Sequence, residues 1–142
     1  QMKGLMEAAG DMSVTLHRAF DVCVDPLETM AQAISLGIDT ILTSGQRNTC
    51  LQGAKLLKEL QDKSKGRITI QAGSGVSAEV IRKLYPLTGI KAYHMTGKRV
   101  IDSEMKFRKK GVNMGLPMFS EYEIWRTEAD NIRAAKEVLE EL

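Results

Sequence analysis

The feature that most constrains the fold is an alternation of strand-like and helix-like segments that repeats along the chain. Short runs rich in β-branched residues predict strands, and longer runs with apolar residues three or four positions apart predict helices. The predicted strands cover residues 13–20, 39–44, 67–73 and 90–95, and the predicted helices cover residues 25–37, 48–66, 77–85 and 127–142. Strands that alternate with helices through short connections predict a parallel sheet and an α/β fold. Residues 96–126 show neither pattern and are expected to be irregular.

Capping residues mark where three of these helices begin. Asp25 followed by Pro26 is a typical helix start, and Ser77 and Thr127 stand at the corresponding place before the third and fourth helices. Their side chains are expected to accept hydrogen bonds from the first amides of each helix, which fixes where each helix starts.

The placement of polar residues in the strands distinguishes two kinds of parallel sheet. In the third predicted strand Ile68 and Ile70 share one face, while Thr69 and Gln71 share the other. Strands of a doubly wound sheet are apolar on both faces, whereas a TIM (β/α)8 barrel can carry polar groups in its lumen near the carboxyl ends of the strands. The pattern favours a TIM-type barrel. A complete barrel needs eight strands and about 250 residues, so the 142 residues predict a single domain, 1–142, with four strand-helix units of a partial barrel.

Composition excludes several classes of partner. The formal net charge is only +2, and the basic residues are interspersed with acidic ones, so no nucleic-acid partner is expected. The apolar runs are far shorter than a membrane span, so no membrane partner is expected. The chain has two cysteines, Cys23 and Cys50, too few for a disulfide framework. A cytoplasmic location with reduced thiols is the expectation.

The stretch TLHRAFD gives the candidate catalytic residues. His17, Arg18 and Asp21 follow the first predicted strand at its carboxyl end, where a barrel places its chemistry. His17 can act as an acid or base, as a metal ligand or as an anion contact, with Asp21 orienting it or pairing with Arg18. The alternative is a structural ion pair between Arg18 and Asp21 that braces the loop.

A second candidate site is a glycine-rich turn before the third helix. The amides of a glycine turn and the free N–H groups of the following helix can hold an anion such as phosphate. The predicted anion-binding residues are Gly73, Ser74 and Gly75 in this turn, Thr96 and Gly97 after the last strand, and Arg108 in a cationic loop. The alternative for the turn is a purely conformational need for glycine.

Two histidines, His17 and His94, are the weak candidates for metal ligands, since both are predicted on the lumen side of the sheet. Two ligands begin a site but do not complete one. The eight methionines are scattered along the chain and are expected to fill the core.

Several motifs, in this order and spacing, resemble the second half of the CutC family, known as copper homeostasis proteins. They are TLHRAFD, DTILTSGQ, ITIQAGSGV, YHMTG and MKFRKKGVNMG. The resemblance implies strands five to eight of a TIM-type barrel plus a closing helix, copper as the bound metal, and a role in copper homeostasis. The cysteines proposed as copper ligands in the family belong to the first strands, which this sequence lacks, and neither Cys23 nor Cys50 stands at such a position.

Two functions follow from these observations, and the residues leave open whether the protein is an enzyme. One is a CutC-like copper-binding protein. The other is a barrel enzyme that binds a small phosphorylated or anionic metabolite through residues 72–77, with His17 as acid or base. In either case four strands cannot close a barrel, so the missing half is expected from the rest of a longer chain or from a second copy. The start at Gln1, within a predicted helix, favours a piece of a longer chain.

Overall fold

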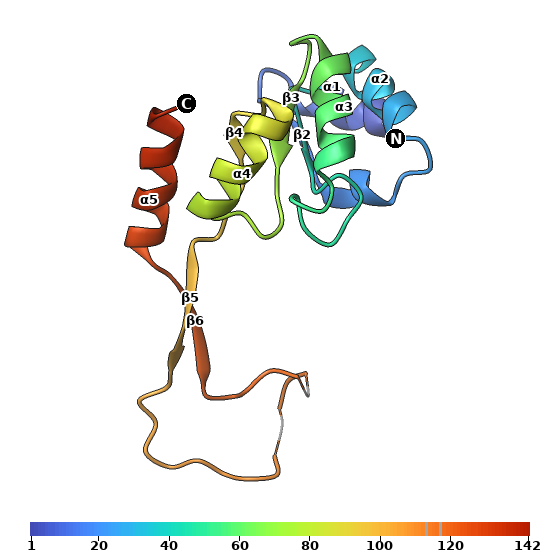
Figure 1. Ribbon diagram of the computed structural model, residues 1–142. Helices are drawn as coiled ribbons and strands as arrows, with labels where there is room; N and C mark the ends of the chain where they lie inside the picture. Colours follow the sequence, from blue (N-terminus) through green and yellow to red (C-terminus); the bar gives the residue numbers. More distant parts are fainter. Residues whose placement is uncertain (113, 117) are drawn as a thin grey trace.

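A parallel sheet of four strands forms the centre of the molecule (Figure 1). The computed structural model describes residues 1–112, 114–116 and 118–142. The strands, which lie in sequence order, are β1 (Thr15–Leu16), β2 (Thr40–Thr43), β3 (Thr69–Ala72) and β4 (Ala92–Tyr93). Each strand pairs with the next in parallel. The predicted α/β fold with a parallel sheet is confirmed.

Helices connect the strands and form one layer. They are α1 (Met2–Ala9), α2 (Pro26–Ser35), α3 (Ala54–Ser64), α4 (Ala78–Thr88) and α5 (Ala129–Glu140), with a short 3-10 helix, η1 (Arg18–Val22), after β1. Helix α2 packs against α3, α3 against α4, and α4 against α5. Because successive helices are neighbours, they follow one another along the sheet.

The burial of the strand residues shows which face of the sheet the helices cover. Ile41 and Ile70 are fully buried in the main core with Leu57 and Leu60 of α3. The alternate residues point to the opposite face, and Thr69 among them is exposed. This difference agrees with the one apolar and one mixed face predicted from the sequence.

The predicted helix caps are confirmed at two of three positions. The Asp25 carboxylate accepts hydrogen bonds from the amides of Leu27 and Glu28, and the Ser77 hydroxyl accepts one from the Val80 amide. The third prediction is wrong, because Thr127 is the last residue of a strand and Glu128 precedes α5 without a side-chain cap.

Three predicted boundaries also differ from the structure. The first strand does not run over residues 13–20, because the chain turns into η1 directly after His17. The second predicted helix starts at Ala54 instead of residue 48, because a turn first brings Gly53 against Ser44. A Cβ atom added to Gly53 would lie 1.9 Å from the Ser44 carbonyl oxygen, so the two backbones touch.

The third difference is a hairpin within residues 96–126, which were predicted to be irregular. Strands β5 (Lys98–Asp102) and β6 (Glu123–Thr127) pair antiparallel, with Val100 opposite Trp125. We call residues 98–127 the arm. It extends away from the other elements, and α5 follows it and returns to pack beside α4 (Figure 1).

None of the helices in the described part of the chain is long and apolar enough to span a membrane.

Candidate functional site

A cleft of about 760 Å³ lies at the carboxyl ends of β3 and β4. We call it the carboxyl-end cleft. Loops after both strands form its walls, together with the first turn of α4, the base of the arm and α5. Its lining residues are Arg18, Ser74, Gly75, Val76, Ser77, Ala78, Glu79, His94, Met95, Thr96, Gly97, Lys98, Asn131 and Ala134.

One wall is the turn that leads into α4. Ser74 and Gly75 both have positive φ angles, +73° and +74°. The Ser74 hydroxyl donates to the Asn48 carbonyl at 2.7 Å, which holds the turn against the preceding loop. The turn therefore presents the first residues of α4 to the cleft, where a helix has amides without intrahelical partners and the positive end of its dipole.

The opposite wall joins the end of β4 to the start of α5. The Gly97 carbonyl accepts from the Asn131 side-chain amide at 3.0 Å and from the Glu128 backbone amide at 3.0 Å. A Cβ atom at Gly97 would lie 2.4 Å from Ile132 Cδ1, and the φ angle is +57°. Glycine is needed here for both reasons, and the packing fixes the position of α5 relative to the cleft.

Asp21 forms a buried network beside the cleft. Its carboxylate accepts from the Thr43 hydroxyl at 2.5 Å, from the Arg18 guanidinium at 2.7 Å and from the amides of Ser44 and Gln46 at 3.1 Å. Burial raises the pKa of Asp21, but these hydrogen bonds outweigh burial and hold the pKa below its ordinary value. The sequence left open a catalytic role or a structural ion pair for this motif. The structure has the ion pair between Arg18 and Asp21, which braces the loop.

His17 has a structural contact of its own. The chain leaves β1 at Leu16, and His17 precedes η1 as its cap, with Nδ1 accepting from the Ala19 amide at 2.9 Å. The side chain is exposed and is not among the residues that line the carboxyl-end cleft. Asp21 instead contacts Arg18 and the end of β2. Among the described residues no hydrogen bond joins Asp21 to His17, so Asp21 does not orient His17 as predicted.

Six predicted site residues follow β3 and β4 in the sequence, five of them for anion binding and one of them His94. The cleft brings five of these six together. Ser74, Gly75, His94, Thr96 and Gly97 all line it. Gly73 is the exception. Its amide donates to the Thr43 carbonyl at 2.9 Å, so it is engaged in sheet pairing and cannot serve an anion.

Arg108 lies on the arm, outside the cleft lining. Its guanidinium donates to the Asp102 carboxylate at 2.6 Å and to the Ser103 carbonyl at 2.7 Å, and it lies 4.9 Å from the centre of the Tyr122 ring. Arg108 therefore holds the far part of the arm together in this structure.

Lys98 and Asn131 are among the lining residues that were not predicted from the sequence. Lys98 follows the predicted YHMTG motif directly, so its proximity to the strand end was an available signal. Asn131 gave no such signal, because its place depends on how α5 packs after the arm.

The residues that the structure describes do not gather into a copper site. Within residues 1–112, 114–116 and 118–142, no three His, Cys, Asp or Glu side chains gather where they could hold a metal. Burial raises the pKa of the Cys50 thiol, which disfavours the thiolate that soft copper(I) prefers. His17 and His94 are therefore not joined by the further ligands that a closed site needs.

The sequence of the chain is similar to known proteins of one family. The model of the CutC family matches residues 1–99. A CutC family protein from Bacteroides fragilis is 48% identical over 123 residues, which are 86% of this chain and 49% of that protein. One from Parabacteroides distasonis is 42% identical over 134 residues, 94% of this chain and 55% of that protein. The chain belongs to the CutC family.

The fold leads to the same family. A crystal structure of CutC from Streptococcus agalactiae, provisionally named a copper homeostasis protein, has a TM-score of 0.61 and 31% identity. The similarity covers 66% of this chain and 46% of that chain. The chain spans about half the length of the curated CutC relatives it matches. Most of the cleft lies in the CutC-matched residues, whereas Asn131 and Ala134 come after them.

Proposed function

We propose that this chain is the carboxyl-terminal half of a CutC-family TIM-type barrel and that its carboxyl-end cleft binds the anionic part of a small molecule, such as a phosphate group. The observation that carries the proposal is the convergence of the α4 amino terminus with Arg18, Lys98 and Thr96 in one cleft. In a barrel, the loops after the last two strands form the usual phosphate site. In such a half-barrel, residues 1–142 form one domain.

The charges in the cleft support an anionic ligand. Lys98 is a cation, Arg18 is a second cation whose charge Asp21 partly offsets, and the positive end of the α4 dipole adds to their field. The one carboxylate in the lining is Glu79, and the Lys83 ammonium lies 2.5 Å from it. That contact lowers the pKa of Glu79, so the group stays charged but is offset by its partner.

A half-barrel also explains the arrangement of the sheet. The helices follow one another along the strands, one face of the sheet is less buried, and β1 and β4 are its two edges. The missing strands come either from the rest of a longer chain or from a second copy. The half-length match to the relatives supports the first source.

Within this proposal, His94 is the imidazole placed to exchange a proton with a bound ligand, because it lines the cleft and His17 does not. Its position follows from the pairing of Gln71 with Ala92, which directs residue 94 to the same side of the sheet as residues 71 and 73. A Cβ atom on Gly73 would lie 3.8 Å from the His94 Cβ atom.

Calorimetric titration with inorganic phosphate tests the site. We expect saturable binding that weakens about tenfold in His94→Gln and in Thr96→Val, since each removes one polar contact. The matched control is His17→Gln, which should change the affinity less than about twofold. Absence of saturable phosphate binding, or equal losses in His94→Gln and His17→Gln, would contradict the proposal.

A second candidate function is copper homeostasis, favoured by the name given to the structurally similar CutC of Streptococcus agalactiae. Since the described residues do not fit copper, this role would draw its ligands from outside them. Titration with copper(I) against a competing chelator separates the candidates: stoichiometric copper(I) binding that is unchanged in His94→Gln, without saturable phosphate binding, would favour copper over phosphate. Both candidates imply the cytoplasm, where free thiols such as Cys23 and Cys50 persist.

A further inference from the structure

The carboxyl-end cleft is larger than a single phosphate group requires. Its volume of about 760 Å³ falls within the range of about 300–1,000 Å³ that holds a whole small metabolite. The cations that line it come from opposite sides of the sheet, since Arg18 follows β1 and Lys98 begins β5 after β4. A ligand in this cleft therefore meets positive charge on two sides.

The Arg18 side chain reaches from the end of β1 to the end of β2. Its Nε atom donates to the Asp21 carboxylate at 2.7 Å, and its Nη2 atom donates to the Ser44 hydroxyl at 2.9 Å. A guanidinium has five N–H groups, so three of them are not used by these two contacts. No other hydrogen bond from this guanidinium is present among the described residues, and the side chain is 44% exposed. Arg18 is thus held in place with donors left for a ligand.

The charge around Arg18 stays positive although Asp21 offsets part of it. The Asp21 side chain is only 8% exposed, and it also accepts hydrogen bonds from a hydroxyl and from backbone amides. A smaller hollow of about 330 Å³ adjoins the pair, and Arg47 lines it together with Arg18 and Asp21. Two arginines and one aspartate give this hollow a net charge of +1. We call Arg18 and Arg47 the arginine pole.

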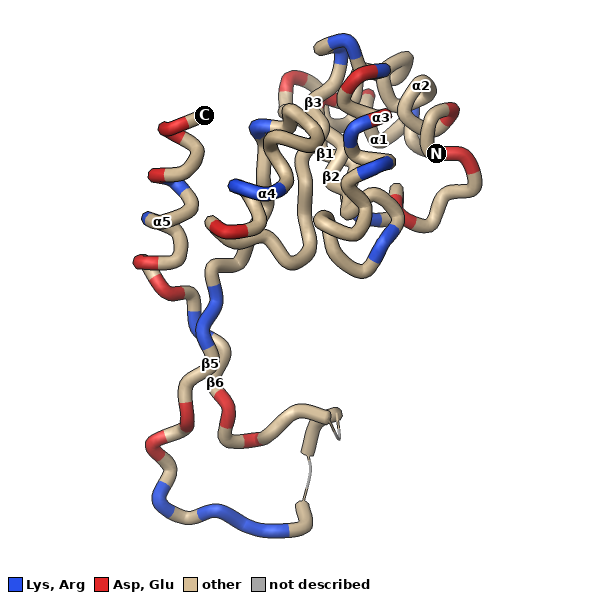
Figure 2. The backbone as a smooth tube through the Cα atoms, viewed as in Figure 1, with Lys and Arg blue, Asp and Glu red and all other residues tan. Residues whose placement is uncertain are grey.

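A second cationic region lies past the end of β4. Thr96 and Lys98 line the cleft there. The Lys98 ammonium lies 3.8 Å from the centre of the Trp125 ring, which holds it at the base of the arm. Figure 2 shows basic residues at this base, where β5 leaves the cleft. We call Thr96 and Lys98 the lysine pole.

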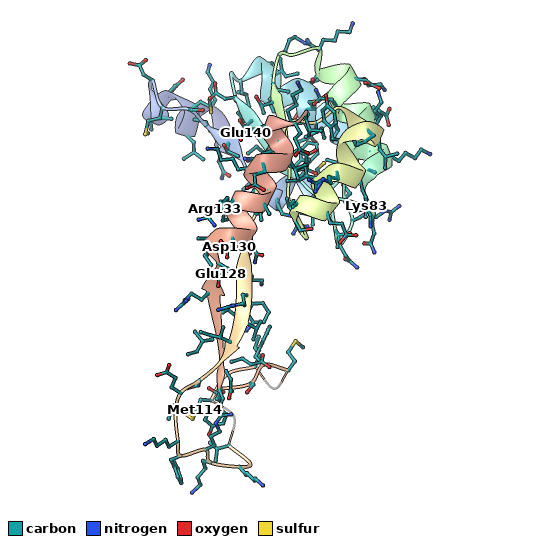
Figure 3. The ribbon with its side chains drawn as sticks, turned by 60° about the vertical axis from the view of Figure 1, so that its left-hand side comes forward. Lys83, Met114, Glu128, Asp130, Arg133 and Glu140 are labelled. Carbon is teal, nitrogen blue, oxygen red and sulfur yellow. The ribbon has the colours of Figure 1, made fainter. Side chains whose placement is uncertain are left out.

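The acidic residues closest to the base of the arm have basic partners of their own. Figure 3 shows Glu128 and Asp130 where α5 begins, beside this base. Glu128 pairs with Arg99 at 3.1 Å, and Asp130 pairs with Arg133. Because these carboxylates are offset, the lysine pole keeps its positive charge.

The order of the strands sets the separation of the two poles. Ser44, which holds Arg18, follows β2, and Thr96 follows β4, with β3 between them. Neighbouring strands lie about 4.8 Å apart, so the poles are about 10 Å apart. One phosphate group cannot contact both poles at that distance, whereas a ligand with an anionic group at each end can.

We propose that the ligand of the carboxyl-end cleft is a small metabolite with two separated anionic groups, one bound at the lysine pole and the other by Arg18. This inference rests on the proposed function and adds to it the class of the ligand. Asp21 and Ser44 are positioning residues, because they hold the Arg18 fork without touching the ligand. A fork fixed in this way loses little freedom when its remaining N–H groups bind a phosphate or a carboxylate.

Calorimetric titration of the 142-residue chain with three phosphonates tests the proposal. Methylphosphonate has one anionic group, methylene bisphosphonate has two adjacent groups, and tetramethylene bisphosphonate has two separated groups. We expect tetramethylene bisphosphonate to bind at least about tenfold more tightly than methylphosphonate, because the second group gains charge-assisted hydrogen bonds. Methylene bisphosphonate should gain less than about threefold, since its groups are too close together to contact both poles.

Arg18→Gln should reduce the tenfold advantage of tetramethylene bisphosphonate to about twofold or less and change the affinity for methylphosphonate less than about threefold. Arg18→Lys keeps a cation beside Asp21 and so preserves the folded loop. It should still reduce the advantage at least about threefold, because an ammonium cannot hold Asp21, Ser44 and a ligand at once. The matched control is Arg67→Gln, at the amino end of β3, which should leave both affinities within about twofold.

The three phosphonates also separate this inference from the proposed function. Equal affinities for methylphosphonate and tetramethylene bisphosphonate, with saturable binding that Thr96→Val weakens, would overturn the inference and leave the proposed anion site in place. An advantage that persists in Arg18→Gln would likewise overturn the inference. Absence of binding by all three phosphonates would overturn it together with the proposed function.

Discussion

At the scale of single residues, Asp21 ties the end of β1 to the end of β2. Its side chain is buried and accepts hydrogen bonds from a hydroxyl, a guanidinium and two backbone amides. A buried carboxylate without such partners would be costly, and a neutral group in its place leaves some of the donors unpaired. Asp21 therefore fixes Arg18, which lines the carboxyl-end cleft.

Asp21→Asn should lower the free energy of unfolding by about 1–3 kcal/mol at pH 7, because donors that now meet a carboxylate lose a partner. The folded-state pKa of Asp21 is lowered, so its stabilisation is present above the ordinary carboxyl value of 3.8 and is lost as the pH falls through the lowered pKa. Urea denaturation should thus show the wild type and the variant converging below pH 3.8. The control, Asp62→Asn, removes an exposed pair with Lys58 and should cost under about 1 kcal/mol. A gap between wild type and Asp21→Asn that stays constant with pH would contradict the assignment.

At the scale of elements, the order of strands and helices was predictable and the details of their ends were not. Apolar spacing and the caps Asp25 and Ser77 are local signals, and the structure follows them. The close contact between Gly53 and Ser44 depends on how two loops meet, which no local pattern contains. The early end of β1 at Leu16 has the same cause, since η1 is held by Asp21 against β2.

The hairpin of the arm was missed for a related reason. Its strands are separated by a long loop, whereas the hairpin signal in a sequence is two runs joined by a two- to five-residue turn. The position of several cleft residues, in contrast, follows from a signal that the sequence does contain. Ser74, Gly75, Thr96 and Gly97 follow parallel strands, and parallel strands end at the same edge of a sheet.

Helix α5 provides a test of how packing supports the cleft. Val138 is 1% exposed and packs in a small core with Ile81 and Ala135, and the same helix holds Gly97 through Asn131. Val138→Ala should cost about 1–3 kcal/mol by leaving a cavity. It should also weaken phosphate binding, although Val138 is not among the cleft-lining residues, because Asn131 and Gly97 lose a fixed position.

Thermal unfolding and phosphate titration of Val138→Ala check both effects. The control on the exposed side of α5 is Lys136→Ala, which removes only a surface pair with Glu140 and should alter neither quantity beyond about 0.5 kcal/mol. Loss of stability with unchanged phosphate affinity would show that α5 does not position the cleft wall.

At the scale of the whole molecule, the sheet has two open edges, β1 and β4. Each edge presents unpaired backbone groups, which native proteins normally cover. Exposed apolar residues flank β1 and η1 in the sequence: Met12 precedes β1, Val22 ends η1 and Val24 follows it. These observations, with a chain that spans about half the length of the CutC relatives it matches, support the proposed half-barrel.

Fragment complementation tests whether a CutC amino-terminal half is what the edges lack. The portion of the 48% identical Bacteroides fragilis protein that lies outside its match to this chain would be expressed separately and mixed with the 142-residue chain. We expect a 1:1 complex by light scattering, a midpoint of unfolding raised by several degrees, and protection of the β1 and β4 amides from hydrogen exchange, because strand pairing buries both edges. Phosphate affinity should rise as the open face of the sheet is enclosed. The matched control is this chain mixed with its own counterpart region from the same relative, which duplicates the half already present. Equal stabilisation by both fragments, or a chain that already unfolds cooperatively as an unassisted monomer with protected edges, would show that the half-barrel needs no partner.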